Sequence, residues 1–202
     1  MRGDPIQVKV LGARMIPQVS DDLREKLGLL PGERSIGILT TDCDDASYAA
    51  IDAATKMTPV RVCYARSMYA GAANANTKLA GEFIGILAGA SPADIRSGME
   101  AAIAYIGDEC CFISANEDDS IVYVAHCISR SGTYLSAQCG IPAGEPLAYL
   151  IAPPMEAILG LDAALKAADV RMVQFYGPPS ETNFAGGLLT GVSSFLAVRR
   201  SL

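Results

Sequence analysis

Several features that mark other classes of protein are missing from this sequence. It has no tryptophan, and no apolar run reaches the ~18 to 20 residues of a membrane span. Its first ten residues contain no hydrophobic signal segment. No P-loop, GxGxxG or HExxH motif occurs, and the six cysteines form no CxxC pair. We therefore expect a cytosolic protein without a membrane span, a nucleotide-binding loop or a zinc ribbon.

Charge is also scarce. Only 19% of the residues are charged and 50% are hydrophobic, whereas soluble domains average about 25% charged residues. We interpret this as a surface partly covered by partner chains, that is, as an oligomer. The net charge of −6 argues against a nucleic-acid partner, because phosphate contacts need a basic surface. A cation or an amine is the natural complement.

An internal repeat organises the chain. IDAATKMTPVR (51–61) and LDAALKAADVR (161–171) match in order, and LGLLPGERSIGIL (27–39) lies over CGIPAGEPLAYLI (139–151). Ala80-Gly81 is aligned with Ala185-Gly186. The three alignments give offsets between the halves of 112 (140−28), 110 (162−52) and 105 (185−80). The period is too long for a solenoid repeat of ~20 to 50 residues. The sequence therefore predicts two tandem domains, 1–109 and 110–202.

Each half is expected to alternate strands and helices. In the first half the patterns predict strands at 8–16, 35–41, 60–66 and 82–89, and helices at 20–27, 46–57 and 91–106. In the second half they predict strands at 110–116, 120–129, 146–152, 170–176 and 188–194, and helices at 134–138 and 155–169. The stretches 67–81 and 177–187 are expected to be loops, and the tail after 194 to be a shortened last helix. This is an α+β fold, with helices on one face of each sheet.

The repeated unit carries a family resemblance. PLAYLIAPPMEAILGLDAALKAADVRMVQFY (146–176) and SIGILTTDCDDASYAAIDAATKMTPVRVCYAR (35–66) resemble the bacterial microcompartment (BMC) shell domain. Each half begins with the strand and short helix that the ordinary domain carries at its end, so the two domains look circularly permuted. With RSMYAGAANA and GPPSETNFAGG, the chain is similar to the tandem shell proteins of ethanolamine utilisation.

The resemblance implies a fold and a function. The fold would be two tandem circularly permuted BMC domains with ferredoxin-like sheets. The protein would be a structural shell component in the cytoplasm and not an enzyme. It would form a pseudohexagonal homotrimer with a gated central pore and small acidic pores that bind or pass ethanolamine and other small metabolites. It would assemble with other microcompartment shell proteins, and no nucleic acid or membrane partner is expected.

Acidic residues indicate where an amine would bind. Asp44 and Asp45 stand at the start of the repeated helix, and Glu82 follows the long loop. Carboxylates lining a small pore favour cations such as the ammonium group of ethanolamine. By similarity to the family's small pores, we expect these three residues around the amine, with Phe112, Thr182 and Asn183 as further candidates. For Asp44 and Asp45, simple N-capping is the alternative.

The resemblance also suggests a gate and an assembly edge. The loop 67–81, with Tyr69, Gly71, Asn74 and Asn76, is interpreted as a gate at the trimer axis, and a surface insertion is the alternative. Lys56 and Lys166, near the ends of the repeated helices, match the family's edge lysine. They would otherwise be solvated lysines favoured by the helix dipole. No cofactor is required, although the resemblance implies cobalamin binding at the trimer axis.

Two other functions stay open. One is a trimeric ligand sensor, and the other is an enzyme in which DCDD (42–45) holds Mg²⁺. Cys43 would be a poor nucleophile, because the surrounding acids raise the pKa of its thiol. We predict no metal site, and we interpret the cysteines as buried small hydrophobes. His126 is interpreted as a packed structural residue, with a metal role beside Cys127 left open.

Overall fold

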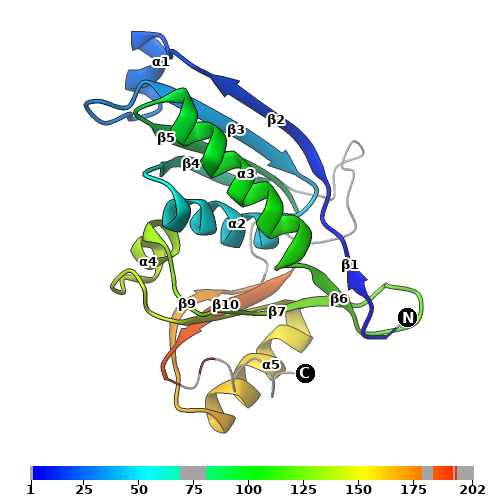
Figure 1. Cartoon of the computed structure of the whole chain (residues 1–202). Helices are drawn as coiled ribbons and strands as arrows, with labels where there is room; N and C mark the ends of the chain where they lie inside the picture. Colours follow the sequence, from blue (N-terminus) through cyan, green and yellow to red (C-terminus); the bar gives the residue numbers. More distant parts are fainter. Residues whose placement is uncertain (1, 69–80, 179–183, 193, 195–202) are drawn as a thin grey trace.

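The computed structural model describes residues 2–68, 81–178, 184–192 and 194. Within these residues two sheets are stacked, with helix α2 (Asp44–Met57) between them and helix α5 (Pro154–Ala167) beyond the second sheet (Figure 1). The strand order is β2-β3-β5-β4 in the first sheet and β1-β6-β7-β8-β10-β9 in the second. All the pairings are antiparallel. The fold class is thus the predicted α+β arrangement.

The first half follows the predicted order of elements. These are β2 (Val10–Ile16), α1 (Asp21–Lys26), β3 (Ser35–Thr41), α2, β4 (Arg61–Met68), β5 (Glu82–Gly89) and α3 (Pro92–Asp108). Helix α3 begins as predicted, because the side chain of Ser91 accepts a hydrogen bond from the backbone N–H of Asp94 and a proline follows the cap. Helix α2 begins two residues earlier than predicted, at Asp44.

The second half differs from the prediction at its two ends. Its elements are β6 (Phe112–Ser114), β7 (Val122–Ile128), α4 (Thr133–Cys139), β8 (Leu147–Ala152), α5, β9 (Arg171–Tyr176) and β10 (Ala185–Thr190), and strand β1 (Pro5–Ile6) of the first half joins its sheet. Strand β10 starts earlier than the predicted 188–194. The prediction was wrong there because it took Gly186 and Gly187 for loop residues, whereas a Cβ at either position would collide with a neighbouring strand.

Strand β1 was not predicted, since a two-residue strand has no periodicity to detect. It pairs with β6, which brings residues 5–6 into the sheet of the second half. The other strands of the two sheets come from residues 10–89 and 112–190 respectively. The division of the chain at residues 109 and 110 stays a prediction.

The halves correspond closely in backbone conformation. Gly28 and Gly140, 112 residues apart, have φ angles of 61° and 62°, and both allow the left-handed conformation that ends a short helix. In the sheets, Leu39 pairs with Gly85 as Leu150 pairs with Gly187. The offset between the halves is therefore 111 (150−39) from β3 to β8 and 102 (187−85) from β5 to β10. The predicted offset of 105 was wrong, because short Ala-Gly pairs match by composition.

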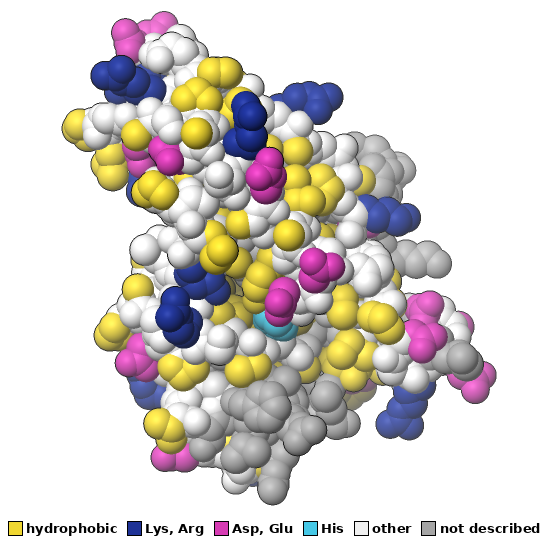
Figure 2. Space-filling model, in the orientation of Figure 1, with side chains coloured by type: hydrophobic (Ala, Val, Ile, Leu, Met, Phe, Trp, Pro, Cys, Tyr) yellow, Lys and Arg dark blue, Asp and Glu magenta, His cyan; other side chains and the backbone are white. Residues whose placement is uncertain are grey.

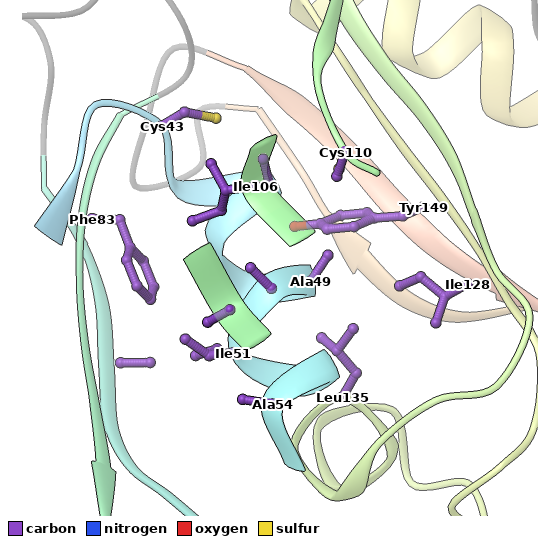
Figure 3. Packing of buried hydrophobic residues seen from close by; sticks show 14 of the residues in the cluster. Cys43, Ala49, Ile51, Ala54, Phe83, Ile106, Cys110, Ile128, Leu135 and Tyr149 are labelled. Atoms are coloured by element: carbon purple, nitrogen blue, oxygen red, sulfur yellow. The ribbon is translucent and has the colours of Figure 1, made fainter. Parts of the chain in front are cut away.

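Helix α2 belongs to the cores of both halves. Ala49 points toward Tyr149, Ile128 and Leu135 of the second half, whereas Ile51 and Ala54 lie on the side of Phe83 (Figure 3). Its alanines allow a helix to pack tightly between two sheets, since small side chains permit close approach. The two halves are thereby joined through one hydrophobic cluster. Among the described residues, no helix combines the length and apolar character needed to cross a membrane.

Candidate functional site

A cavity of about 590 Å³ lies at the junction of the two halves, beside the first turn of α2. Both halves contribute to its wall. It is lined by Asp44, Asp45, Tyr48, Ala65, Arg66, Ser67, Tyr134, Leu135, Gln138, Tyr149, Ile151, Tyr176, Gly177, Phe184 and Ala185. The site therefore combines two adjacent carboxylates with four tyrosines and one arginine.

The side chain of Asp44 is bound by backbone N–H groups. Its side chain is only 3% exposed, and its Oδ1 accepts hydrogen bonds from the N–H groups of Gly81 (3.2 Å) and Asp45 (3.0 Å). Burial raises the pKa of Asp44 from 3.8 to about 6, although hydrogen bonds from Ser67 and Gly81 oppose the shift. A cation in the cavity would offset this burial cost.

The side chain of Asp45 is bound by a residue of the second half of the chain. The hydroxyl of Tyr149 in β8 donates a hydrogen bond of 2.8 Å to its Oδ1. Burial, and then the charge of Asp44, raise the pKa of Asp45 well above its usual value. The N-cap of α2 is Cys43, whose side chain makes no capping hydrogen bond to any described residue. Asp44 and Asp45 thus occupy the first turn of the helix, where its dipole favours negative charge.

Four tyrosines surround the carboxylates, and sequence reasoning missed all of them. The rings of Tyr48 and Tyr134 are stacked with their centroids 6.1 Å apart, and the hydroxyl of Tyr48 lies 3.0 Å from Ser67 Oγ. Tyr149 and Tyr176 complete the wall from β8 and β9. Aromatic faces attract ammonium groups, and hydroxyls bind polar ligands. These residues come from separate elements, so no local sequence pattern connects them.

The other predicted pore residues lie around the cavity. Glu82 is half-buried and begins β5, next to the Gly81 N–H that binds Asp44. Phe112 is fully buried behind the wall, with its ring 5.7 Å from that of Phe184, which lines the cavity. Their roles toward an amine stay predictions. The remaining candidates, Thr182 and Asn183 of the pore and Tyr69, Gly71, Asn74 and Asn76 of the gate, lie outside the described residues.

The two predicted edge lysines have unequal surroundings. Lys56 is half-buried at the junction, where its Nζ donates a hydrogen bond of 2.9 Å to the carbonyl of Arg130. Burial lowers the pKa of Lys56. Lys166, with a side chain 76% exposed, forms an ion pair of 2.6 Å with Asp162 one turn earlier in α5. The role of both lysines at an assembly edge stays a prediction.

Other titratable groups at the junction have structural partners. Asp52 accepts hydrogen bonds from the N–H groups of Gly132 (2.6 Å) and Leu135 (2.8 Å), and so caps helix α4. His126 is partly buried and hydrogen-bonded through Nε2 to the hydroxyl of Tyr105. Within the described part of the chain, no three His, Cys, Asp or Glu side chains are grouped to hold a metal. On the face shown in Figure 2, Lys and Arg side chains are dispersed over the surface.

These features define a class of protein. The chain has two similar α+β units, and helix α2 of the first unit covers the sheet of the second. The BMC domain family matches residues 35–116. The chain is 59% identical over 194 residues to the bacterial microcompartment shell protein EutL of Clostridium perfringens, covering 96% of this chain and 89% of that protein.

Further comparisons agree. The chain is 46% identical to the EutL shell protein of Salmonella typhimurium over 93% of this chain and 86% of that protein. The crystal structure of the ethanolamine utilization protein EutL from Leptotrichia buccalis superposes with a TM-score of 0.92 at 62% identity, covering all of this chain and 92% of that one. The chain belongs to the EutL family of bacterial microcompartment shell proteins. It is accordingly a structural component of a microcompartment shell, assembled with other shell proteins, and not an enzyme.

Proposed function

We propose that the junction cavity is a small acidic pore that binds or passes ethanolamine and other small metabolites through the shell. The observation that carries this proposal is the pair of buried carboxylates, Asp44 and Asp45, on a cavity of about 590 Å³ walled by tyrosines. A relative 62% identical to this chain is an ethanolamine utilization protein. An ammonium group is a cation of the size and charge that this wall would stabilise.

The two ends of ethanolamine match two kinds of group at the site. Its ammonium can lie between the aromatic rings and the buried carboxyl groups of Asp44 and Asp45, where the cation would favour their ionised forms. Its hydroxyl can exchange hydrogen bonds with Ser67 or a tyrosine hydroxyl. Arg66 also lines the cavity, and it would discourage ligands that carry a second positive charge.

The assembly that uses this pore is a homotrimer, in which three chains with two similar domains each would give a pseudohexagonal outline. A central opening gated by Tyr69, Gly71, Asn74 and Asn76 belongs to the same proposal. That gate rests on the sequence alone, since these residues lie outside the described ones. Cobalamin binding at the trimer axis also rests only on the resemblance, because such an axis lies between chains.

Titration calorimetry with ethanolamine tests the pore. We expect binding to the wild-type protein and a loss of at least about tenfold in affinity for Asp45→Asn, because one buried carboxylate partner is removed. Ethylene glycol, which lacks the amine, should not bind. Glu82→Gln measures whether Glu82 takes part, and equal affinity would remove that residue from the site. Equal binding of ethylene glycol and ethanolamine would refute an amine pore.

Light scattering and electron microscopy test the assembly. We expect a trimer in solution and flat sheets at high concentration. A protein that binds ethanolamine but never tiles would instead support the trimeric ligand sensor.

A further inference from the structure

A second cavity, of about 610 Å³, adjoins the candidate site. It lies between strand β4 and helix α4 (Figure 1), so that the first half of the chain forms one wall and the second half the other. Four residues line both cavities, and these are Ala65, Arg66, Tyr134 and Gln138. The two cavities therefore share part of one wall, and a ligand in the first can extend toward the second.

The two cavities differ in charge. The carboxyl groups of Asp44 and Asp45 line the first, whereas no acidic residue lines the second. Of the two arginines in the second cavity, Arg61 forms an ion pair of 2.7 Å with Glu33. Arg66 forms no ion pair with a carboxylate in the described part of the chain. The charge of the wall therefore changes from negative to positive at Arg66.

Local contacts hold the side chain of Arg66 at this boundary. Its Cζ lies 5.6 Å from the centroid of the Tyr64 ring, and its Nη1 donates a hydrogen bond of 3.2 Å to the carbonyl of Ala65. A guanidinium has several N–H donors, so others remain for a ligand. Burial, and then Tyr48, raise the pKa of Tyr134, and the charge of Arg66 opposes this shift. The field of Arg66 thus reaches the wall that the second half provides.

The internal repeat shows that the acids and the arginine occur together. Arg66 pairs with Ile84 in the first sheet as Tyr176 pairs with Gly186 in the second, at the offset of 102 (186−84) that relates β5 to β10. Tyr176 is therefore the equivalent of Arg66. The first two residues of α2 are acidic and those of α5 are not, namely Asp44 and Asp45 against Pro154 and Met155. Both charges of the site are thus confined to the first half.

We propose that Arg66 selects ligands by the charge on the end that lies away from the carboxylates. An ammonium group binds beside Asp44 and Asp45, and the other end of the same molecule points past Arg66 toward the second cavity. Amines whose other end is neutral or anionic are favoured, and diamines are disfavoured. This inference rests on the pore proposed above and specifies the class of amine that the pore takes.

Electrostatics gives the sign and the size of the effect. A positive far end is repelled by the guanidinium, a negative one is attracted and a neutral one is nearly unaffected. A unit charge a few Å from a solvated arginine changes affinity by roughly tenfold. Arg66 is exposed, so salt should screen the effect. A loss of shape at the site would instead change the affinities of all amines in the same direction.

Calorimetry with three matched ligands tests the selection. Propanolamine, trimethylenediamine and β-alanine each carry one ammonium on a chain of the same length, and their far ends are neutral, positive and negative at pH 7.5. Arg66→Gln should bind trimethylenediamine about tenfold more tightly than the wild type and β-alanine about tenfold more weakly, with propanolamine changed by less than about twofold. These differences should shrink at about 0.5 M salt.

Three further variants separate charge from structure. Arg66→Lys retains the charge and should rank the ligands as the wild type does. Arg66→Met retains the aliphatic stem beside Tyr64 and should behave like Arg66→Gln. Arg96→Gln is the control for a change of net charge, because exposed Arg96 of α3 lines neither cavity. Its affinities should equal those of the wild type, and circular dichroism should be unchanged in every variant.

The outcomes distinguish this inference from the pore itself. If Arg66→Gln and Arg66→Met change all three affinities by the same factor, Arg66 does not select by charge, and the inference is wrong while the pore stands. If the wild-type protein binds neither ethanolamine nor propanolamine, the proposed pore is rejected, and the inference with it.

Discussion

Replacing Asp44 by asparagine should make the protein more stable and less able to bind an amine. The carboxylate is 3% exposed, and its pKa is raised from 3.8 to about 6. A shift of about two pKa units corresponds to at most about 3 kcal/mol of stability lost on ionisation. An asparagine Oδ1 can still accept from the N–H groups of Gly81 and Asp45. Because neutral acceptors are weaker than charged ones, we expect a net gain of about 1–2 kcal/mol at pH 7.5.

The gain should depend on pH in a defined direction. The folded state holds the proton of Asp44 more tightly than the unfolded state, so the penalty of ionisation is absent below about pH 3.8 and grows as the pH rises to about 6. Above that pH it is constant. Asp44→Asn should therefore exceed the wild type by more at pH 7.5 than at pH 4.5.

Urea denaturation followed by circular dichroism, at fixed protein concentration and both pH values, measures this effect. Exposed Asp169→Asn is the control for a change of surface charge. The reasoning is refuted if Asp44→Asn is no more stable than the wild type at pH 7.5, or if its advantage is the same at both pH values. Calorimetry on the same variant should show weaker ethanolamine binding, since stability and function are opposed at this carboxylate.

Three further results are expected. Tyr149→Phe removes the hydrogen bond of 2.8 Å to buried Asp45. Urea denaturation should show a free energy of unfolding lower by about 1–3 kcal/mol. An unchanged midpoint would mean that water replaces the hydroxyl. Asp52→Ala removes both acceptors at the start of α4 and should cost about 2 kcal/mol in the same assay. Asp52→Asn should also destabilise the protein, because the amide has one acceptor oxygen where Asp52 uses two, Oδ1 for Leu135 and Oδ2 for Gly132. Lys56→Ala combined with Lys166→Ala should abolish flat sheets in electron micrographs; sheets that form as before would exclude both lysines from the edge.

Local patterns were sufficient for most of the elements. The turn glycines Gly28 and Gly140, the cap at Ser91 and the Ala-rich helices act through neighbouring residues, so their positions could be predicted. The errors arose where a distant neighbour decides. Gly186 belongs to strand β10 because β8 leaves no room for a side chain there, and β1 exists only because β6 accepts it.

The candidate site was predicted only in part, because some of its residues form a local pattern and others are brought together by distant packing. Asp44 and Asp45 are conspicuous as acids at a helix start, and the structure places both on the cavity. The tyrosines were missed because they are spread from residue 48 to residue 176 and lie together only when the second half packs on α2.

The sequence by itself determined that the chain is a duplication, that each half is a permuted shell domain, and where acid is concentrated. Those properties follow from composition, spacing and resemblance. Only the tertiary structure decided that the two repeated helices are not equivalent in their surroundings: α2 is buried between two sheets, and α5 presents Met155 and Leu159 to the outside. The Asp, Ala and Lys residues that the two helices share cannot reveal this difference, because burial depends on what packs against a helix. The second half covers α2, whereas no described element covers Met155 and Leu159 of α5.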